Sequence, residues 1–287
     1  MGLAALTELF EVIDIVDPAD PRVDDFRDLN SIDRRPDRVG TAELPGKALV
    51  IAEGVLVAQR MLASRFPTHA LFGTDRRLQQ LRGDPLTPVN PQSAALPFYR
   101  TTAEVMAEVV GFHLNRGVLA VSRRPDPLDP GSLLESARTV AVLEGVNDHE
   151  NIGSIFRNAA GLGVEAVFLG AATADPLYRR AVRVSMGHVL LVPFAHLDSW
   201  PSDLKLLQNN EFRVISLTPD PAAAVLADAI DGAGKVAFMV GAEGPGLSES
   251  AMRAGNVCAR IPMSRGTDSL NVATAAAMAF YERVRSG

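Results

Sequence analysis

Short apolar runs alternate with amphipathic stretches along most of the chain, and this alternation predicts strands and helices in turn. In the N-terminal half the pattern starts at Lys47. Its apolar runs and helical patterns are residues 47–52, 54–64, 68–74, 75–81, 96–100, 101–111 and 118–122. They predict a small α/β domain. The residues before Lys47 are rich in Asp, Arg and Pro and contain one helical pattern, near residues 22–31.

The C-terminal half repeats the alternation on a larger scale, with nearly continuous apolar runs. The predicted strands are residues 138–145, 165–170, 188–194, 212–218, 235–241 and 256–262. Such runs are typical of a parallel sheet that is covered on both faces. Ligands bind such sheets beyond the carboxyl ends of the strands. Gly145, Thr218, Gly241 and Ile261 lie at or just after predicted strand ends, so we expect them to meet at one edge of one sheet.

A proline-rich and charged stretch separates the two halves. Residues 123–132, RRPDPLDPGS, have the composition of a linker. We therefore expect an N-terminal domain over residues 1–122 and a C-terminal domain over residues 133–287.

Composition narrows the class of protein. With 287 residues and 47% hydrophobic positions the chain can bury two cores. Its single cysteine, Cys258, and five scattered histidines give no metal-ligand spacing, so we expect no metal. The N-terminal residues are acidic where a secretory signal is basic, and no apolar run is long enough to span a membrane. A cytoplasmic protein is the resulting expectation.

The formal charge of −6 disfavours general coating of nucleic acid, because Lys and Arg contacts to phosphate supply most non-specific affinity. The arginines are nevertheless clustered. The clusters are Arg34, Arg35 and Arg38; Arg76, Arg77 and Arg82; Arg123 and Arg124; and Arg179, Arg180 and Arg183. Each cluster is either a local RNA contact or an ordinary solvated face.

Two turns near the C-terminus carry the candidate chemistry. The first, GAEGPGLSES from Gly241, is rich in glycine, which leaves backbone groups open to a flat ligand. The second brings Asp268, Ser269 and Asn271 to the start of a helix, where polar side chains and free N–H groups share one pocket.

Together with an earlier segment, these turns resemble the three motifs of the SpoU-type (TrmH-like) RNA 2′-O-ribose methyltransferases of the SPOUT class. The first motif is matched by Asn151, Gly153, Arg157 and Asn158, the second by Gly241, Glu243, Gly244, Gly246 and Leu247, and the third by Ile261, Pro262, Met263, Ser269, Leu270 and Asn271. One departure is Ala242, where many relatives carry Asn. Three motifs in the family's order are far more specific than one glycine pattern.

The resemblance implies a C-terminal SPOUT domain with a deep trefoil knot, which periodicity alone would never predict. For residues 1–122 it implies a substrate-recognition domain with a ribosomal-protein-like fold. The implied reaction is methyl transfer from S-adenosylmethionine to a ribose 2′-hydroxyl of RNA, with ribosomal RNA favoured over transfer RNA. The implied assembly is a homodimer with its active site near the interface.

The resemblance also assigns the site residues. Gly241, Ile261 and Leu270 match cofactor contacts, and the strand-end position adds Leu217 and Thr218 as cofactor candidates. The alternative is that Gly241 only ends a strand and that Ile261 and Leu270 are core residues.

The catalytic candidates are Asn151, Arg157, Glu243, Ser269 and Asn271. The family places the arginine at the ribose. Because a guanidinium keeps its proton, we expect Arg157 to bind the target phosphate or stabilise the developing alkoxide rather than accept a proton. An ion pair from Arg157 to Glu243 or Asp148 is a compatible structural role. Helix capping explains Asn151 about as well as catalysis does. Ser269 and Asn271 are expected to contact the substrate or Arg157, with an N-cap of the final helix as the alternative role of Ser269.

Three other functions remain open at this point: a transfer RNA 2′-O-methyltransferase, a catalytically silent knotted RNA-binding protein, and a dinucleotide-dependent oxidoreductase. The last lacks the usual GxGxxG turn after the first strand, and its glycines at positions 241, 244 and 246 have the reverse spacing.

Overall fold

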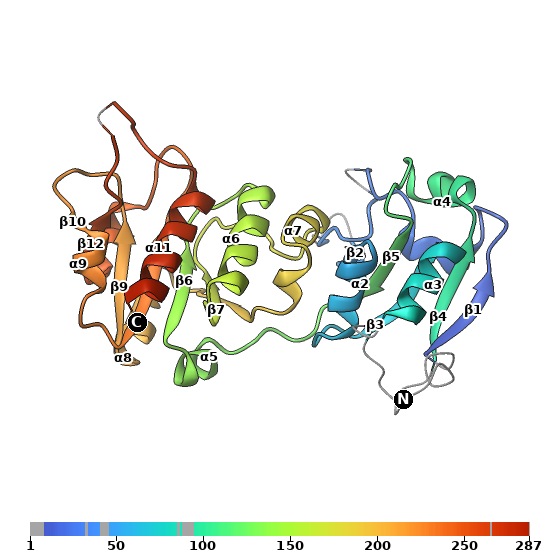
Figure 1. Ribbon diagram of the computed structural model, residues 1–287, viewed down its shortest axis with the longest axis horizontal. Helices are drawn as coiled ribbons and strands as arrows, with labels where there is room; N and C mark the ends of the chain where they lie inside the picture. Colours follow the sequence, from blue (N-terminus) through green and yellow to red (C-terminus); the bar gives the residue numbers. More distant parts are fainter. Residues whose placement is uncertain are drawn as a thin grey trace. The chain divides into compact units, whose positions relative to one another are not determined.

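The computed structural model describes residues 9–31, 34–40, 46–84, 87, 95–264 and 266–286. By packing, the chain forms two units (Figure 1). Unit 1 contains the described residues up to Asp126 together with Leu177–Leu191. Unit 2 contains Pro127–Pro176 and the residues from Val192 onward.

Unit 2 is built on one seven-stranded sheet in the order β10-β12-β9-β11-β6-β7-β8. Its strands are β6 (Thr139–Leu143), β7 (Ala166–Leu169), β8 (Phe194–His196), β9 (Phe212–Leu217), β10 (Ala224–Val225), β11 (Lys235–Val240) and β12 (Val257–Arg260). All neighbouring strands are parallel, which confirms the predicted α/β class and parallel sheet. The carboxyl ends of β9, β11 and β12 therefore lie at one edge.

Helices complete unit 2. They are α5 (Pro130–Ser136), α6 (His149–Gly161), α8 (Leu204–Asn209), α9 (Leu226–Ile230), α10 (Glu249–Ala254) and α11 (Val272–Ser286). The last helix packs against α6 and β11, so the C-terminal segment lies beside an element from the start of the unit. In α11, Ala273 and Phe280 are buried, whereas Val284 is exposed.

Two local predictions in this half were wrong. Residues 188–194 form a 3₁₀ turn, η2 (His188–Leu190), before the short strand β8, because the buried Ser185 hydroxyl accepts the N–H groups of Gly187 and Val189 and curls the chain. The stretch 123–132 is not all linker. Helix α5 begins at Pro130, with Asp129 as its N-cap.

Unit 1 has a five-stranded mixed sheet in the order β1-β4-β3-β5-β2. The strands are β1 (Phe10–Asp14), β2 (Val50–Glu53), β3 (Thr68–Thr74), β4 (Leu96–Thr101) and β5 (Val118–Ser122). The helices are η1 (Pro21–Phe26), α2 (Val55–Leu62), α3 (Asp75–Gly83) and α4 (Ala103–Val110). The predicted alternation is confirmed from Lys47 onward. The helix predicted near 22–31 is only the 3₁₀ segment η1, and strand β1 was missed.

A segment that follows β7 in sequence completes unit 1. Helix α7 (Arg179–Val184) packs on β2. Its first residue, Arg179, donates its backbone N–H to Asp37 at 2.9 Å and a guanidinium N–H to the buried carboxylate of Glu53 at 3.0 Å. Buried charges are tolerated when they are paired in this way.

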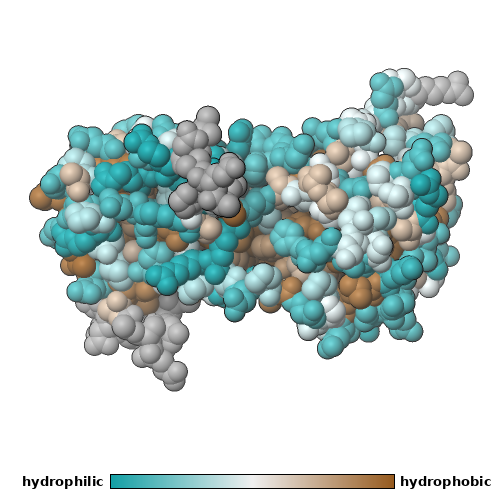
Figure 2. Space-filling model, turned by 180° about the vertical axis from the view of Figure 1, so that it is seen from behind, coloured by the Kyte–Doolittle hydropathy of each residue, from teal (hydrophilic) through white to brown (hydrophobic). Residues whose placement is uncertain are grey.

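The face of the molecule in Figure 2 is largely hydrophilic, with hydrophobic residues in separate patches. Each unit has its own buried apolar cluster, which includes Phe168 and Met239 in unit 2 and Phe26 and Phe72 in unit 1. Among the described residues, no helix has the length and apolar character needed to cross a bilayer.

Burial raises the pKa of the Asp37 carboxyl above its ordinary value of 3.8, although the Arg179 N–H and the charge of Arg35 act in the opposite direction. The folded protein, in which the Asp37 pKa is higher, binds more protons than the unfolded chain. The contribution of Asp37 to stability therefore falls as pH rises from the unfolded-state pKa to the folded-state pKa. We expect the difference in unfolding free energy, wild type minus Asp37→Asn, to decrease from acid to neutral pH. Urea unfolding of the full-length protein, followed over a pH series, measures it.

Asp14 is a control, because its pKa is shifted in the opposite direction. A hydrogen bond from Arg100 lowers the pKa of its carboxyl, so the difference between wild type and Asp14→Asn should increase with pH. Parallel pH profiles for the two variants would contradict the assignment for Asp37.

Candidate active site

A cavity of about 480 Å³ lies where β9, β11 and β12 end. The loops that follow these strands form its walls, together with the segment before α11. The five predicted cofactor residues all line it: Leu217, Thr218, Gly241, Ile261 and Leu270. The structure therefore brings together residues that are dispersed between positions 217 and 270, as the strand-end argument predicted.

Gly241 allows the loop after β11 to fold back on itself. A Cβ atom at this position would lie 2.2 Å from the backbone carbon of Gly246 and the backbone nitrogen of Leu247. The turn is closed by the Gly246 N–H, which donates to the Ala242 carbonyl at 3.0 Å. Gly244 and Gly246 both have positive φ, at 87° and 72°. Glycine is thus required at Gly241 by close approach and at the other two positions by backbone conformation.

Three polar side chains from separate segments meet beside this turn. Glu243 Oε1 accepts hydrogen bonds from the side-chain amides of Asn151 and Asn271, each at 2.9 Å. The Asn271 amide also donates to Asn151 Oδ1 at 2.8 Å. We call Asn151, Glu243 and Asn271 the polar cluster. Glu243, Asn271 and Ser269 line the cavity, and the buried Asn151 holds the other two from behind.

The capping roles differ from those expected. Helix α6 is capped by Asp148, which accepts the Glu150 N–H at 2.7 Å, so Asn151 is not its cap. The start of α11 is capped by Asn271, whose Oδ1 accepts from Ala273 and Thr274. The amide N–H of Asn271 therefore donates within the polar cluster while its Oδ1 caps the helix. Ser269 is exposed and lines the cavity.

Comparison with known proteins identifies a family whose matched residues include this site. Residues 138–281 match the SpoU rRNA Methylase family, and this range contains all three motifs. The chain belongs to this family. An uncharacterized tRNA/rRNA methyltransferase of Mycobacterium tuberculosis is 62% identical over 269 residues, which cover 93% of this chain and 89% of the relative.

Two further proteins widen the comparison. A 23S rRNA (guanosine-2′-O-)-methyltransferase RlmB of Xylella fastidiosa is 29% identical over 68% of this chain and 80% of its own. The crystal structure of an AdoMet-bound rRNA methyltransferase from Sinorhizobium meliloti has a TM-score of 0.76 and covers 96% of this chain and 98% of its own, at 23% identity. The predicted family is confirmed, and the chain is a SpoU-family RNA methyltransferase.

Arg157 is the one catalytic candidate that neither lines the cavity nor forms a hydrogen bond with a described residue that does. It lies on α6, is exposed, and does not line the cavity. Within the described ranges it makes no ion pair, so the alternative of a bridge to Glu243 or Asp148 is wrong here. Its neighbour Asn158 instead faces α11 and donates to the Ala273 carbonyl at 3.1 Å.

A buried carboxylate that the motifs did not reveal supports the glycine turn. Glu144 follows β6 directly, and its oxygens accept from Trp200 Nε1 at 2.6 Å and from the N–H and hydroxyl of Ser248, each at 2.7 Å. Ser248 ends the turn and caps α10. In the sequence, an acidic residue directly after an apolar strand was the feature that could have indicated this role of Glu144.

The close approach at Gly241 predicts a sharp cost for any side chain there. In Gly241→Ala the turn must move, and we expect a loss of roughly 1–3 kcal/mol in unfolding free energy, typical of overpacking. Gly234→Ala is the matched control, since a Cβ there meets nothing within 4 Å and φ is not positive. Equal stability of the two variants in urea unfolding would contradict the packing argument.

Proposed function

We propose that this enzyme transfers a methyl group from S-adenosylmethionine to a ribose 2′-hydroxyl of ribosomal RNA. The observation that carries the proposal is the polar cluster, which stands at the rim of a cavity built from strand-end loops. The similarity to a 23S rRNA guanosine-2′-O-methyltransferase supports both the hydroxyl as acceptor and ribosomal RNA as substrate.

The residues of the cavity fit the proposed cofactor. Its volume of about 480 Å³ is in the usual range for small-molecule sites, roughly 300–1,000 Å³. Leu217, Ile261 and Leu270 offer apolar surface for the faces of a purine, and the tight turn at Gly241 presents backbone groups to its edge. When bound, S-adenosylmethionine supplies a methyl group activated by a sulfonium charge.

Within the polar cluster, Glu243 is the group that we assign to the acceptor hydroxyl. Both asparagine amides donate to Oε1, and Oε2 accepts no hydrogen bond from another described side chain. The carboxylate is thus fixed in orientation with one oxygen left to accept the hydroxyl hydrogen. Positioned proton acceptors typically contribute about 10²–10⁴-fold to rate.

Arg157 is assigned to the target phosphate. Its guanidinium is exposed and makes no ion pair with the described carboxylates, so it is available to an incoming anion. A guanidinium binds phosphate through two parallel N–H groups, which fixes the position of the nucleotide as well as neutralising its charge.

We also retain the homodimer, the knot and the domain roles as parts of the proposal. Helix α11 exposes Met278, Tyr281 and Val284, which lie three residues apart and so share one face. These side chains are the proposed dimer contact.

The packing of α11 on α6 is compatible with the proposed trefoil knot. Residues 1–122 are assigned to RNA recognition and residues 133–287 to methyl transfer, and a ribosomal RNA substrate favours the cytoplasm.

Removal of the Arg157 side chain should separate turnover from cofactor binding. We expect Arg157→Ala to lower methyl transfer at least about 100-fold, as loss of a directed donor does, with S-adenosylmethionine affinity nearly unchanged. Arg253→Ala is the control, because Arg253 is also an exposed helical arginine but pairs with Glu249. Methyl incorporation and calorimetry measure the two quantities, and equal turnover in both variants would refute the assignment.

Site mapping of ribose methylation tests the substrate. We expect one ribosomal RNA position to lose its 2′-O-methyl group in cells without this gene, and to regain it with the wild-type chain but not with Arg157→Ala. A missing methyl group in transfer RNA would replace the proposed substrate. Cofactor binding without any methyl loss would instead favour a silent RNA-binding protein.

The exposed face of α11 predicts how the dimer can be broken. The double variant Tyr281→Glu and Val284→Glu should sediment as a monomer where the wild type sediments as a dimer, since buried charges without partners are costly. Val16→Glu is the control, because Val16 is 84% exposed on unit 1. A monomeric wild type would end the dimer proposal.

A further inference from the structure

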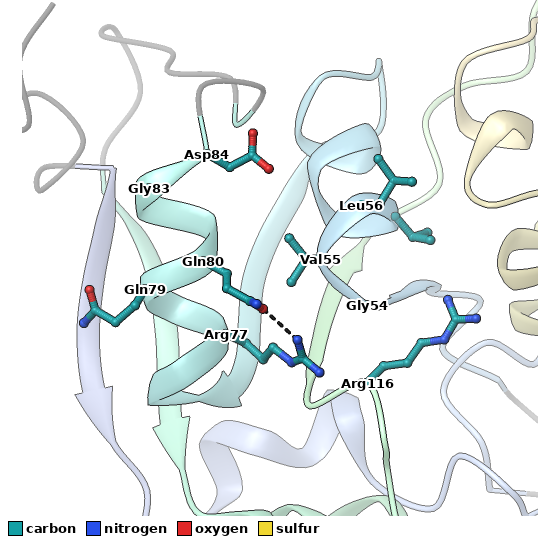
Figure 3. A pocket seen from close by; sticks show the side chains of 10 residues that line it. Gly54, Val55, Leu56, Arg77, Gln79, Gln80, Gly83, Asp84 and Arg116 are labelled. Atoms are coloured by element: carbon teal, nitrogen blue, oxygen red, sulfur yellow. Dashed lines mark hydrogen bonds between the residues drawn. The ribbon is translucent and has the colours of Figure 1, made fainter.

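Unit 1 contains a second cavity that the methyl-transfer site does not use. It is a groove of about 810 Å³ between α2 and α3 (Figure 3). Its lining residues are Gly54, Val55, Leu56, Val57, Arg77, Gln79, Gln80, Gly83, Asp84 and Arg116. All of them belong to the described part of unit 1.

Positive charge gathers at the end of the groove where α2 begins. Arg116 lies over Gly54, since a Cβ there would be 3.1 Å from its Cδ atom. Arg116 pairs with Glu53 at 3.8 Å, but Glu53 is bound more closely by Arg179, at 3.0 Å. One buried negative charge therefore faces two arginines, and Arg116 is left incompletely neutralised.

Arg77 adds a second positive charge at the same end. Its guanidinium donates to the Gln80 side-chain oxygen at 2.7 Å, which is a neutral partner. It makes no ion pair with the described carboxylates. The acidic lining residue, Asp84, follows the last turn of α3, about 10 Å along the axis at 1.5 Å per residue, and lies at the opposite end in Figure 3.

The backbone of α2 adds hydrogen-bond donors beside these arginines. Ala58 donates the first intrahelical bond, to Gly54, so the N–H groups of Val55, Leu56 and Val57 have no carbonyl partner within the helix. No side chain caps this end. Gly54 has φ of 95°, a conformation that favours glycine and leaves no Cβ beside the first turn.

The rest of the groove is mixed in character. Val55 and Leu56 give it an apolar wall, and Leu56 is 38% exposed. Gln79 and Gln80 contribute amides, which donate and accept hydrogen bonds. A ligand that suits all three features carries an anionic group, a flat apolar face and polar edges. An unpaired nucleotide of RNA has these properties, with its phosphate, base faces and base edges.

We propose that this groove holds a single-stranded segment of the RNA substrate, with a phosphate between Arg77, Arg116 and the first turn of α2, and with the adjoining base against Val55 and Leu56. The inference rests on the proposed function, because it takes the RNA to be the methylation substrate. It also explains how a chain with a charge of −6 binds RNA, since the contact is local rather than spread over the surface.

The test compares two double variants of the full-length protein. Arg77→Ala with Arg116→Ala removes the proposed contacts. Arg76→Ala with Arg123→Ala is the control, since it removes the same charge from exposed unit 1 positions outside the groove lining. Filter binding measures affinity for ribosomal RNA from cells without this gene over a range of salt concentrations, and calorimetry measures S-adenosylmethionine binding.

The groove variant should bind RNA at least about tenfold more weakly for each arginine removed. Its dependence of log affinity on log salt should become shallower by about 0.7, because one phosphate contact of a single strand is lost. S-adenosylmethionine affinity should stay at the wild-type value. Affinity and salt dependence equal to those of the control would overturn the proposal.

A lysine variant, Arg77→Lys with Arg116→Lys, separates phosphate binding from a purely structural role. It should keep the wild-type salt dependence while losing part of the affinity, because lysine keeps the charge but not the paired N–H groups. A lysine variant as weak and as salt-insensitive as the alanine variant contradicts the proposal. Failure of the wild type to bind S-adenosylmethionine would instead refute the proposed function, whatever the groove variants show.

Discussion

The hydrogen bonds of the polar cluster are the constraint on which the site depends. They join the helix after β6, the turn after β11 and the start of the last helix. Asn151 and Glu243 are 92 residues apart in sequence, and Glu243 and Asn271 are 28 residues apart. Each amide group of the cluster has its partners inside it or in a helix cap. Only Asn151 of the three is buried, so loss of either partner would leave one end of its amide without a bond, at a cost of about 1–3 kcal/mol.

The parallel sheet makes this meeting possible. Because β6 and β11 are neighbours with the same direction, the loops that follow them leave the sheet side by side. A Cβ at Gly145 would lie 3.1 Å from that of Ala242, which shows how closely these loops pass. Glu144 then fixes the far end of the glycine turn through Ser248. The turn is held by a carboxylate at each end, Glu243 in the cavity and Glu144 in the core.

Much of this arrangement could be predicted from the sequence, because it depends on local signals. Apolar runs identified β6, β7, β9, β11 and β12, and parallel strands bring their ends to one edge. Long-range partners could not be predicted in the same way. Capping of α11 was the alternative role of Ser269, whereas the structure has Asn271 as the cap, since both residue types cap helices and only the geometry of the turn distinguishes them. The linker predicted over residues 123–132 overlaps the start of α5, although Asp129 followed by Pro130 is a helix-start signal.

Residues Leu177–Leu191 belong to unit 1 but follow β7 of unit 2, and this order affects how the protein is made. A ribosome delivers the chain from its N-terminus, and domains generally fold as units while synthesis continues. Unit 1 departs from this order, because its residues Leu177–Leu191 are encoded after unit 2 has begun. When Asp126 emerges, Glu53 still awaits Arg179, and strand β2 lacks α7 along its side. The buried carboxylate of Glu53 therefore gains its ion-pair partner only after Pro127–Pro176 of unit 2 have been synthesised, so the packing of unit 1 is completed late in translation.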